Sequence, residues 1–191
     1  MGSEMCIRDR LQVEGILQLA SGDEWSFDWI VNAAGPWSAQ LLAQSGIQSS
    51  FNVALIRGSH LRFGSTLSHP LVVQSRVDHR IVFLLPERDG LLCGTTEVHQ
   101  KVEEPIQCHS EEEAYLLRAV QGVLSVELTA SGIVDRFAGV RPIAFKGPAI
   151  GHFSSASRDS EIEVNRQLIT IFGGKWTSAM HLGEQIARLV Q

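Results

Sequence analysis

The sequence predicts a mixed fold in which α/β segments near both ends of the chain flank an antiparallel sheet. Residues 29–45 and 168–190 each form a pattern of a buried strand, a turn of small residues and a helix. Between them, short β-type runs follow one another with turn residues in the links, which is typical of an antiparallel sheet. The expected class is therefore α/β combined with α+β.

Composition excludes several kinds of protein. The 191 residues are 44% hydrophobic and 19% charged, as in ordinary globular domains. The net charge of −5 argues against a nucleic-acid binder, which would carry a basic surface. No apolar run approaches the roughly 20 residues that span a bilayer. The cysteines, Cys6, Cys93 and Cys108, are widely spaced, so we expect no metal site, no disulfide framework and a cytoplasmic setting.

The first strand–turn–helix pattern lies near the N-terminus. An apolar strand over residues 29–33 ends in Ala34-Gly35-Pro36-Trp37, and a helix over residues 38–45 follows. Pro36 suits a first helical turn, where its missing N–H would have had no partner. The small residues Ala33, Ala34 and Gly35 would let a ligand approach the main chain.

The second pattern lies near the C-terminus. A strand of apolar and β-branched residues over 168–172 leads through Gly173-Gly174 to Lys175, and a helix over residues 178–190 follows. Backbone N–H groups, the positive end of the helix dipole and the charge of Lys175 would then favour an anion at this turn. The alternative is a turn that serves packing alone, because such turns occur in many α/β proteins.

The middle of the chain predicts an antiparallel sheet. Its expected strands are residues 53–56, 60–63, 71–74, 81–85 and 91–95, with a turn at 57–59 and a hairpin turn at 86–90. Ser110 to Glu113 predicts a capping box at the start of an amphipathic helix. Residues 133–145 predict another strand, interrupted at 139–142.

Separated motifs together resemble a known family. Residues 31–37 (VNAAGPW), 139–142 (GVRP) and 172–177 (FGGKWT) are similar to motifs of the D-amino-acid-oxidase-like flavoproteins. Residues 55–60 (LIRGSH) and 94–97 (GTTE) narrow the resemblance to the FAD-dependent glycerol-3-phosphate dehydrogenases. The sequence lacks the G-x-G-x-x-G turn with which such enzymes hold the FAD pyrophosphate. We therefore expect a fragment, truncated at both ends, that binds FAD poorly by itself.

The resemblance implies a division of the chain. Residues 1–10 are expected to be a non-native leader, and residues 11–50 the last part of an incomplete Rossmann-like FAD-binding domain. Residues 51–150 would form the antiparallel substrate-binding domain, and residues 151–191 the return strand and helix of the FAD-binding domain. The turns after Asn32 and around Lys175 should converge on one crevice beside the sheet that carries Arg141.

The resemblance also implies a reaction and its residues. Such enzymes oxidise glycerol 3-phosphate to dihydroxyacetone phosphate with FAD and pass the electrons to a quinone. His60 would lie near the reacting hydroxyl as its acid/base group or its hydrogen-bond partner. Arg141 would be the phosphate clamp, Arg158 a looser substrate contact, and Lys175 the charge that stabilises reduced flavin. The implied cofactor-binding residues are Ala33, Ala34, Gly35, Trp37, Gly173, Gly174, Lys175, Trp176 and Thr177. Structural alternatives are a packing role for His60, surface ion pairs for the arginines and a solvated Lys175.

Three functions stay open at this point. The first is oxidation of a small phosphorylated substrate, with a quinone partner and peripheral association of the full-length enzyme with the inner membrane. Many family members continue the lysine motif as Lys-Leu-Thr-Thr-Tyr-Arg, whereas residues 176–181 here are WTSAMH. This departure leaves room for a 2-hydroxy acid or an amino acid as substrate. The third possibility is a fragment without catalytic activity.

Overall fold

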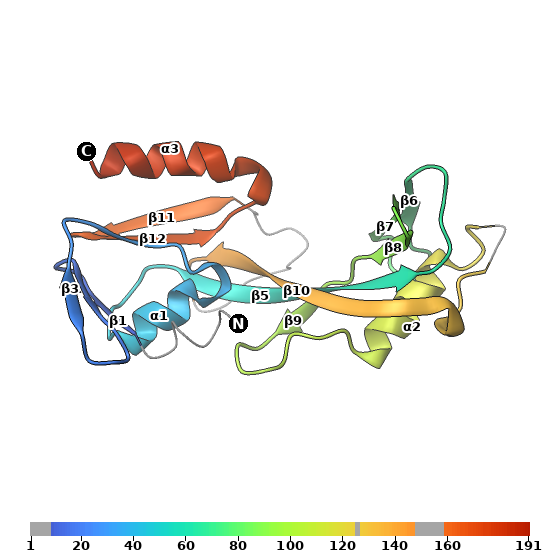
Figure 1. Ribbon diagram of the computed structural model, residues 1–191, viewed down its shortest axis with the longest axis horizontal. Coiled ribbons are helices and arrows are strands. Elements are labelled where there is room, and N and C mark those ends of the chain that lie inside the picture. The colour runs from blue at the N-terminus through green and yellow to red at the C-terminus, as the bar shows by residue number, and fades with distance from the viewer. Residues whose placement is uncertain (1–8, 125–126, 148–158) are drawn as a thin grey trace. The chain divides into compact units, whose positions relative to one another are not determined.

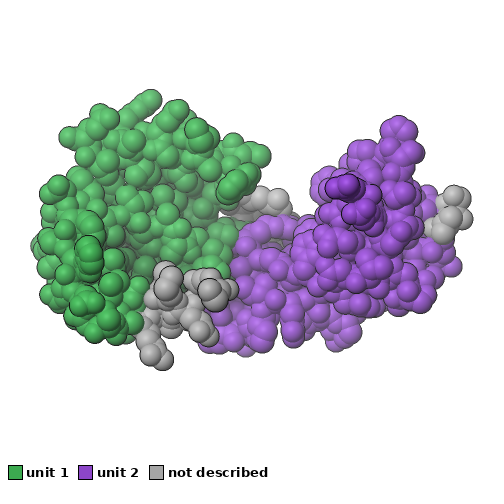
Figure 2. Space-filling view, in the orientation of Figure 1, with its two compact units in different colours: residues 1–55, 142–191 green, residues 56–141 purple. Residues whose placement is uncertain are grey.

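The chain divides into two compact units. The computed structural model describes residues 9–124, 127–147 and 159–191. Residues 1–55 and 142–191 form the first unit, and residues 56–141 form the second (Figure 2). Both units mix strands with helices, which confirms the predicted fold class. The functional division expected at residues 50 and 150 stays a prediction.

The first unit contains two small sheets. In one, β1 (Arg10–Gln12), β2 (Ile16–Gln18) and β3 (Glu24–Ser26) form an antiparallel meander. In the other, β12 (Leu168–Gly173) lies between β11 (Ser160–Asn165) and β4 (Ile30–Asn32), and Figure 1 shows β11 beside β12. The pairing of β11 with β12 is antiparallel, whereas β12 and β4 run parallel. This parallel pair gives the first unit its α/β character.

Both helices predicted for the first unit begin with a 3₁₀ turn. The turn η1 (Gly35–Trp37) precedes α1 (Ser38–Gln44), and the turn η4 (Trp176–Ser178) precedes α3 (Ala179–Leu189). The core of this unit gathers apolar side chains from strand, helix and link: Leu11, Leu42, Phe51, Leu168 and Phe172. The rings of Phe51 and Phe172 lie 5.4 Å apart, and this contact joins the chain after α1 to β12.

The second unit is built on a larger sheet that includes the two longest strands of the described chain. The strand order is β10 (Ile133–Phe145), β5 (Asn52–Phe63), β8 (Gly90–Gly94), β7 (Ile81–Glu87) and β6 (Leu71–Gln74), and β9 (Val98–Gln100) also pairs with β5. The predicted hairpin of β7 and β8 forms as expected. The helix α2 (Ser110–Val120) covers one face of the sheet, and η2 (Ala130–Gly132) leads into β10.

The core of the second unit lies between the sheet and α2. It contains Leu61, Phe63, Val73, Val82, Leu84, Leu91 and Cys93 from the strands, with Leu116, Ala119 and Val120 from α2. Alternate residues of β7 are exposed, as Ile81, Phe83 and Leu85 show. One face of the sheet is therefore packed, and the other is open to a ligand.

Two predicted interruptions are wrong. The turn expected at residues 57–59 does not form, and β5 is one continuous strand. Arg57 and Ser59 point to the α2 side of the strand, where Glu112 binds both of them. The interruption expected at residues 139–142 is also absent, since β10 is continuous. Pro142 is tolerated because β10 is at the end of the strand order, and an edge strand has N–H positions without a partner in the sheet.

The start of α2 lies one residue earlier than predicted. His109, rather than Ser110, is the N-cap, and it forms the capping box with Glu112. The Glu112 carboxylate accepts a hydrogen bond from the His109 backbone N–H at 3.3 Å. No helix in the described part of the chain has the length and apolar character needed to cross a membrane.

Candidate functional site

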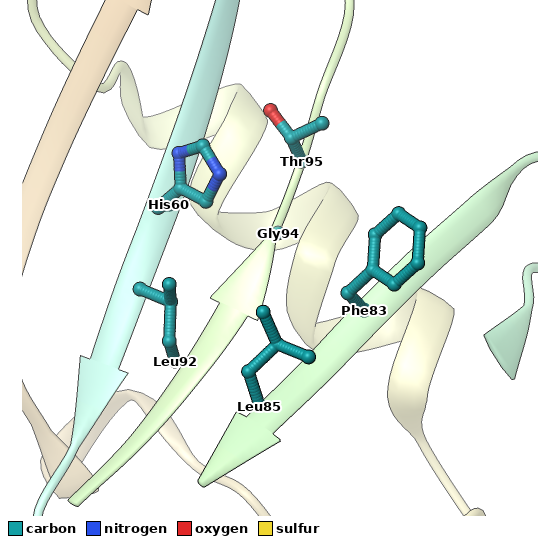
Figure 3. A pocket seen from close by; sticks show the side chains of 6 residues that line it. All are labelled: His60, Phe83, Leu85, Leu92, Gly94 and Thr95. Carbon is teal, nitrogen blue, oxygen red and sulfur yellow. The ribbon is translucent and has the colours of Figure 1, made fainter. Parts of the chain in front are cut away.

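A small cavity opens on the face of the sheet that points away from α2. Its volume is about 60 Å³, and its lining residues are His60, Phe83, Leu85, Leu92, Gly94 and Thr95 (Figure 3). These side chains come from β5, β7, β8 and the residue after β8. Strand register explains their meeting, because Gly94 is paired with His60 on one side and with Phe83 on the other. The walls are mainly apolar, and His60 and Thr95 supply the polar groups.

Two neighbours fix the His60 ring. A Cβ built on Gly94 would lie only 2.2 Å from Cδ2 of His60, so this ring position requires a glycine on the adjacent strand. On its other side the ring stacks on Phe137, with the centroids 5.0 Å apart and the planes inclined by 9°. The imidazole is therefore held between β8 and β10.

The environment keeps His60 neutral. Burial, followed by the positive charge of Arg141, lowers the pKa of His60 from its ordinary value of 6.5. A backbone hydrogen bond with Gly58 would raise this pKa, but among the described residues the buried Nδ1 has no hydrogen-bond partner. The lowering of the His60 pKa by burial therefore outweighs the opposing effect of Gly58. Near pH 7 the ring is an uncharged imidazole that can take up a proton.

Arg141 lies close to this cavity in the same unit. Its Nη2 donates a hydrogen bond to Oγ1 of the cavity residue Thr95 at 3.2 Å, and its Nη1 lies 3.3 Å from Oε1 of Glu97. A Cβ on Gly58 would come within 2.7 Å of Nη2 of Arg141. The glycine that suggested a turn instead provides the space for this guanidinium. His60 and Arg141, predicted separately, are thus brought to the same region of the second unit.

A buried polar network that the sequence did not predict lies on the opposite face of the sheet. Glu112 of α2 accepts hydrogen bonds from Arg57 Nε at 2.9 Å, Ser59 Oγ at 2.8 Å and Thr96 Oγ1 at 2.6 Å. Arg57 also donates to Gln100 Oε1 at 2.6 Å. Each of these residues is at most 4% exposed. The network joins α2 to the strand positions on either side of Gly58 and to the residue after Thr95.

The Glu112 carboxylate is ionised in this network. Burial acts to raise its pKa, but hydrogen bonds from Thr96, Ser59 and Arg57 together lower it below its ordinary value. The only sequence signal was the charge of Arg57 within an apolar run. A pairing over 55 residues leaves no periodic pattern, so its partner could not be read from the sequence.

In the first unit, the two predicted cofactor turns lie at the same edge of the sheet. Asn32, the last residue of β4, pairs in parallel with Thr170 of β12. The turn after Asn32 and the turn after Gly173 therefore leave the sheet in the same direction, and η1 packs against β12. This part of the predicted convergence is present within the first unit. A meeting of these turns with Arg141 stays a prediction.

The turn after β4 is held by a buried amide. Asn32 Nδ2 donates to the Ser38 carbonyl at 3.1 Å, and Asn32 Oδ1 accepts from the Ala34 N–H at 3.3 Å. Gly35 has a φ of +56°, and among the described residues no atom beyond its chain neighbours lies within 4 Å of the position of a Cβ there. Ala33 is exposed, and Ala34 and Trp37 are half-buried. The exposed Ala33 and the open space at Gly35 thus leave room beside this turn.

The turn after β12 is closely packed at Gly173 and exposed at Lys175. Gly173 has a φ of +70°, and a Cβ there would lie 3.1 Å from the Asp159 carbonyl oxygen, so packing alone explains this glycine. Gly174 has a φ of +108° with only an ordinary contact nearby. The Lys175 ammonium lies 3.4 Å from Oδ1 of Asp159.

Two further predicted residues of this turn are exposed, Thr177 and Trp176, the latter to 94%. An almost fully exposed tryptophan shows that the fold of the described residues does not require this side chain for its own core. Arg158, the looser substrate candidate, lies outside the described residues.

Comparisons with known proteins give the same family as the sequence motifs at residues 31–37, 139–142 and 172–177. The model of the family described as FAD dependent oxidoreductase matches residues 6–189. A glycerol-3-phosphate dehydrogenase of Pseudomonas aeruginosa is 33% identical over 85% of this chain and 33% of its own length. A D-erythritol 1-phosphate dehydrogenase of Brucella abortus is 32% identical over 82% of this chain and 32% of its own length. The chain thus spans about a third of the length of these relatives.

A solved structure has the same fold. The glycerol-3-phosphate dehydrogenase from Bacillus halodurans complexed with FAD matches with a TM-score of 0.76 and 23% identity, over 97% of this chain and 38% of that one. The FAD expected from the motifs is the cofactor named in the family description. With nearly the whole chain matched, this protein belongs to the FAD dependent oxidoreductase family.

Proposed function

We propose that the chain is part of an enzyme that oxidises sn-glycerol 3-phosphate to dihydroxyacetone phosphate, with FAD as hydride acceptor and a quinone as onward acceptor. The observation that carries the proposal is the placement of His60 and Arg141 beside Thr95 on the open face of one sheet. A neutral base and a fixed cation at neighbouring positions suit a substrate that has both a hydroxyl and a phosphate. The 33% identity to a glycerol-3-phosphate dehydrogenase supports the same substrate.

Arg141 is proposed to bind the phosphate. A guanidinium can donate two parallel hydrogen bonds to phosphate oxygens, which fixes orientation as well as charge. The Thr95 hydroxyl accepts a hydrogen bond from Nη2, so the guanidinium is oriented before a ligand arrives. This preorganisation favours binding because the side chain loses less conformational freedom when the phosphate arrives.

His60 is proposed to take the hydroxyl proton. Its lowered pKa keeps the imidazole unprotonated near neutral pH, as a general base requires. The Phe137 ring and the absence of a Cβ on Gly94 hold the imidazole in one orientation. A fixed base next to a fixed cation would place the carbinol carbon reproducibly relative to the hydride acceptor.

The turns of the first unit fit a flavin. Open space at Gly35, an exposed Ala33 and an exposed Trp176 leave room for a large planar group. Residues 33–37 and 173–177 would hold it, and Lys175 would supply positive charge toward a reduced, anionic ring. FAD, when bound, supplies the hydride acceptor. Electrons would leave to a quinone, so we propose a cytoplasmic enzyme that associates peripherally with the inner membrane.

The test is a replacement of matching segments. The 191-residue chain would replace the corresponding segment of the Pseudomonas aeruginosa relative, and flavin bleaching by sn-glycerol 3-phosphate and reduction of a soluble quinone would be recorded. We expect both reactions in the chimera and little retained flavin in the chain alone, because the chain lacks the pyrophosphate-binding glycine turn. A folded, flavin-loaded chimera that glycerol phosphate does not bleach would contradict the proposal.

A second candidate substrate is a longer phosphorylated polyol. The 32% identity to a D-erythritol 1-phosphate dehydrogenase favours it, since the two relatives are about equally similar to this chain. The ratio of kcat/KM for the two phosphates in the same chimera decides between them. If the chimera instead oxidised a 2-hydroxy acid or an amino acid that carries no phosphate, that compound would be the substrate and Arg141 would have no phosphate to bind.

A further inference from the structure

We propose that Glu97 occupies the place of the substrate phosphate on Arg141 and is displaced from it on binding, so that Glu97 weakens the affinity for phosphate. This inference rests on the function proposed above, in which Arg141 is the phosphate clamp. It concerns a residue to which neither the motifs nor the comparisons give a role.

The contacts of Glu97 are unequal. Its Oε1 lies 3.3 Å from Nη1 of Arg141, whereas its Oε2 lies 2.9 Å from Nη2 of Arg80. Arg80 also donates through Nη1 to the Glu97 backbone carbonyl at 3.5 Å. Glu97 can therefore lose the longer contact with Arg141 and remain anchored by Arg80. A carboxylate with a second anchor is suited to repeated displacement and return.

Arg141 also keeps an anchor when Glu97 leaves. Its Nη2 donates to Thr95, whereas the contact with Glu97 is made by Nη1. The side chains of Glu97 and Arg141 are 17% and 35% exposed, so water and a small anion can reach the pair. The guanidinium thus stays in position, and the carboxylate can be exchanged for a phosphate oxygen.

Charge favours this exchange. One carboxylate is shared by two guanidinium groups, so Glu97, Arg80 and Arg141 together carry a formal charge of +1. A phosphate carries more negative charge than a carboxylate and presents its oxygens in the geometry that a guanidinium binds. Because Glu97 competes for the same donor, its neutralisation should strengthen phosphate binding, whereas removal of an ordinary substrate contact would weaken it.

The experiment measures binding to the whole 191-residue chain by calorimetry. The probes are sn-glycerol 3-phosphate and inorganic phosphate, with glycerol as the ligand without phosphate. We expect Glu97→Gln to lower the Kd for both phosphates by about two- to fivefold, the size expected for loss of a partly exposed competing ion pair. Glycerol binding should not change.

Glu113→Gln is the matched control. Glu113 also pairs with an arginine of the second unit and is 20% exposed, but within the described residues its ion pair is with Arg136 rather than Arg141. This variant loses the same charge and should leave the Kd for phosphate unchanged. Glu97→Asp keeps the charge but shortens the side chain, so its Kd should lie between those of the wild type and Glu97→Gln. If thermal melting shows that Glu97→Gln does not fold, the Kd of Glu97→Asp tests the proposal in its place.

The outcomes separate this inference from the proposed function. Weaker or unchanged phosphate binding in Glu97→Gln overturns the inference, as does the absence of phosphate binding in both wild type and variant. Tighter binding together with a chimera that does not oxidise glycerol phosphate would leave the displacement by phosphate intact and refute only the proposed reaction.

Discussion

The His60 imidazole lies over Gly94 of the neighbouring strand, where a Cβ would come within 2.2 Å of Cδ2. The two residues are direct partners in the register of β5 and β8. The glycine therefore determines where the histidine can be, although it has no functional group of its own. A single added methyl group tests whether this ring position matters for the proposed reaction.

Gly94→Ala should lower kcat of the flavin-loaded chimera by roughly 10- to 100-fold, because a displacement of about 1 Å at a catalytic group can have an effect of this size. The methyl group would overlap Cδ2 and Cγ of His60, and Phe137 limits where the ring can move. Steady-state quinone reduction measures the effect.

Gly139→Ala is the control for this substitution. Gly139 lies on β10 of the same unit, and in the described part of the chain no atom beyond its neighbours lies within 4 Å of the position that an added Cβ would take. Its activity should match that of the parent chimera. If Gly94→Ala were equally active, the orientation of His60 would have no part in the reaction.

Arg141→Ala should raise KM for the phosphorylated substrate and lower kcat/KM. The corresponding loss of transition-state stabilisation should be about 2–4 kcal/mol, the range for losing a charged hydrogen-bonding partner. Arg136 lies on the same strand but pairs with Glu113, so the Arg136→Ala variant should have a kcat/KM close to that of the parent. Kinetics with sn-glycerol 3-phosphate provide both values. Equal kcat/KM in Arg141→Ala and parent would remove Arg141 from the substrate site.

The titration of His60 should be visible in stability. Burial and the charge of Arg141 lower its pKa in the folded chain below the value of 6.5 expected when unfolded. Between these two pKa values the unfolded chain binds more protons, so the free energy of unfolding falls as the pH decreases below about 6.5. Thermal unfolding of the 191-residue chain from pH 7.5 to 5 should show a steeper loss in wild type than in His60→Gln. Parallel curves would mean that the His60 pKa is unperturbed.

Sequence patterns predicted the elements whose signal is local. The strand–turn–helix segments at residues 29–45 and 168–190 and the hairpin of β7 and β8 need only apolar periodicity and turn residues to be recognised. The same local rules failed at Gly58, where glycine indicated a turn. Its actual role is to leave space for Arg141, a residue 83 positions later, and no local rule contains that information.

Candidate site residues were recognised by motif rather than by position in space. The motifs contain His60 and Arg141 separately, and the structure adds the groups that hold them: Gly94, Phe137, Thr95 and Glu97. Glu112 shows the same limit, because the sequence placed it in the first turn of a helix but not under the sheet. Its three side-chain partners, Arg57, Ser59 and Thr96, come from segments up to 55 residues away. Long-range polar contacts of this kind become visible only when the chain is folded.

Glu112→Ala should therefore destabilise the chain strongly. It removes the only carboxylate that the described structure pairs with Arg57 and leaves that guanidinium charged and buried, a change that costs about 3–5 kcal/mol in other proteins. Because the pKa of Glu112 is lowered in the folded chain, its contribution is present above the unfolded value of 4.5 and is lost as the pH falls through the folded-state pKa. Urea unfolding of the 191-residue chain at pH 7 and at pH 4 measures both effects.

Glu111→Ala, at the residue next to Glu112, is the control that separates loss of the buried polar network from loss of any glutamate in this helical turn. Glu111 belongs to the same first turn of α2 but is exposed, and its side chain accepts a hydrogen bond from the neighbouring Ser110. Its removal should change the unfolding midpoint little. The difference in stability between wild type and Glu112→Ala should also shrink as the pH falls below 4.5, because the unfolded chain then binds a proton at Glu112 more readily than the folded chain does. A small loss at pH 7, equal to that of Glu111→Ala, would show that Arg57 finds another partner or water and that the buried pair does not hold α2 to the sheet.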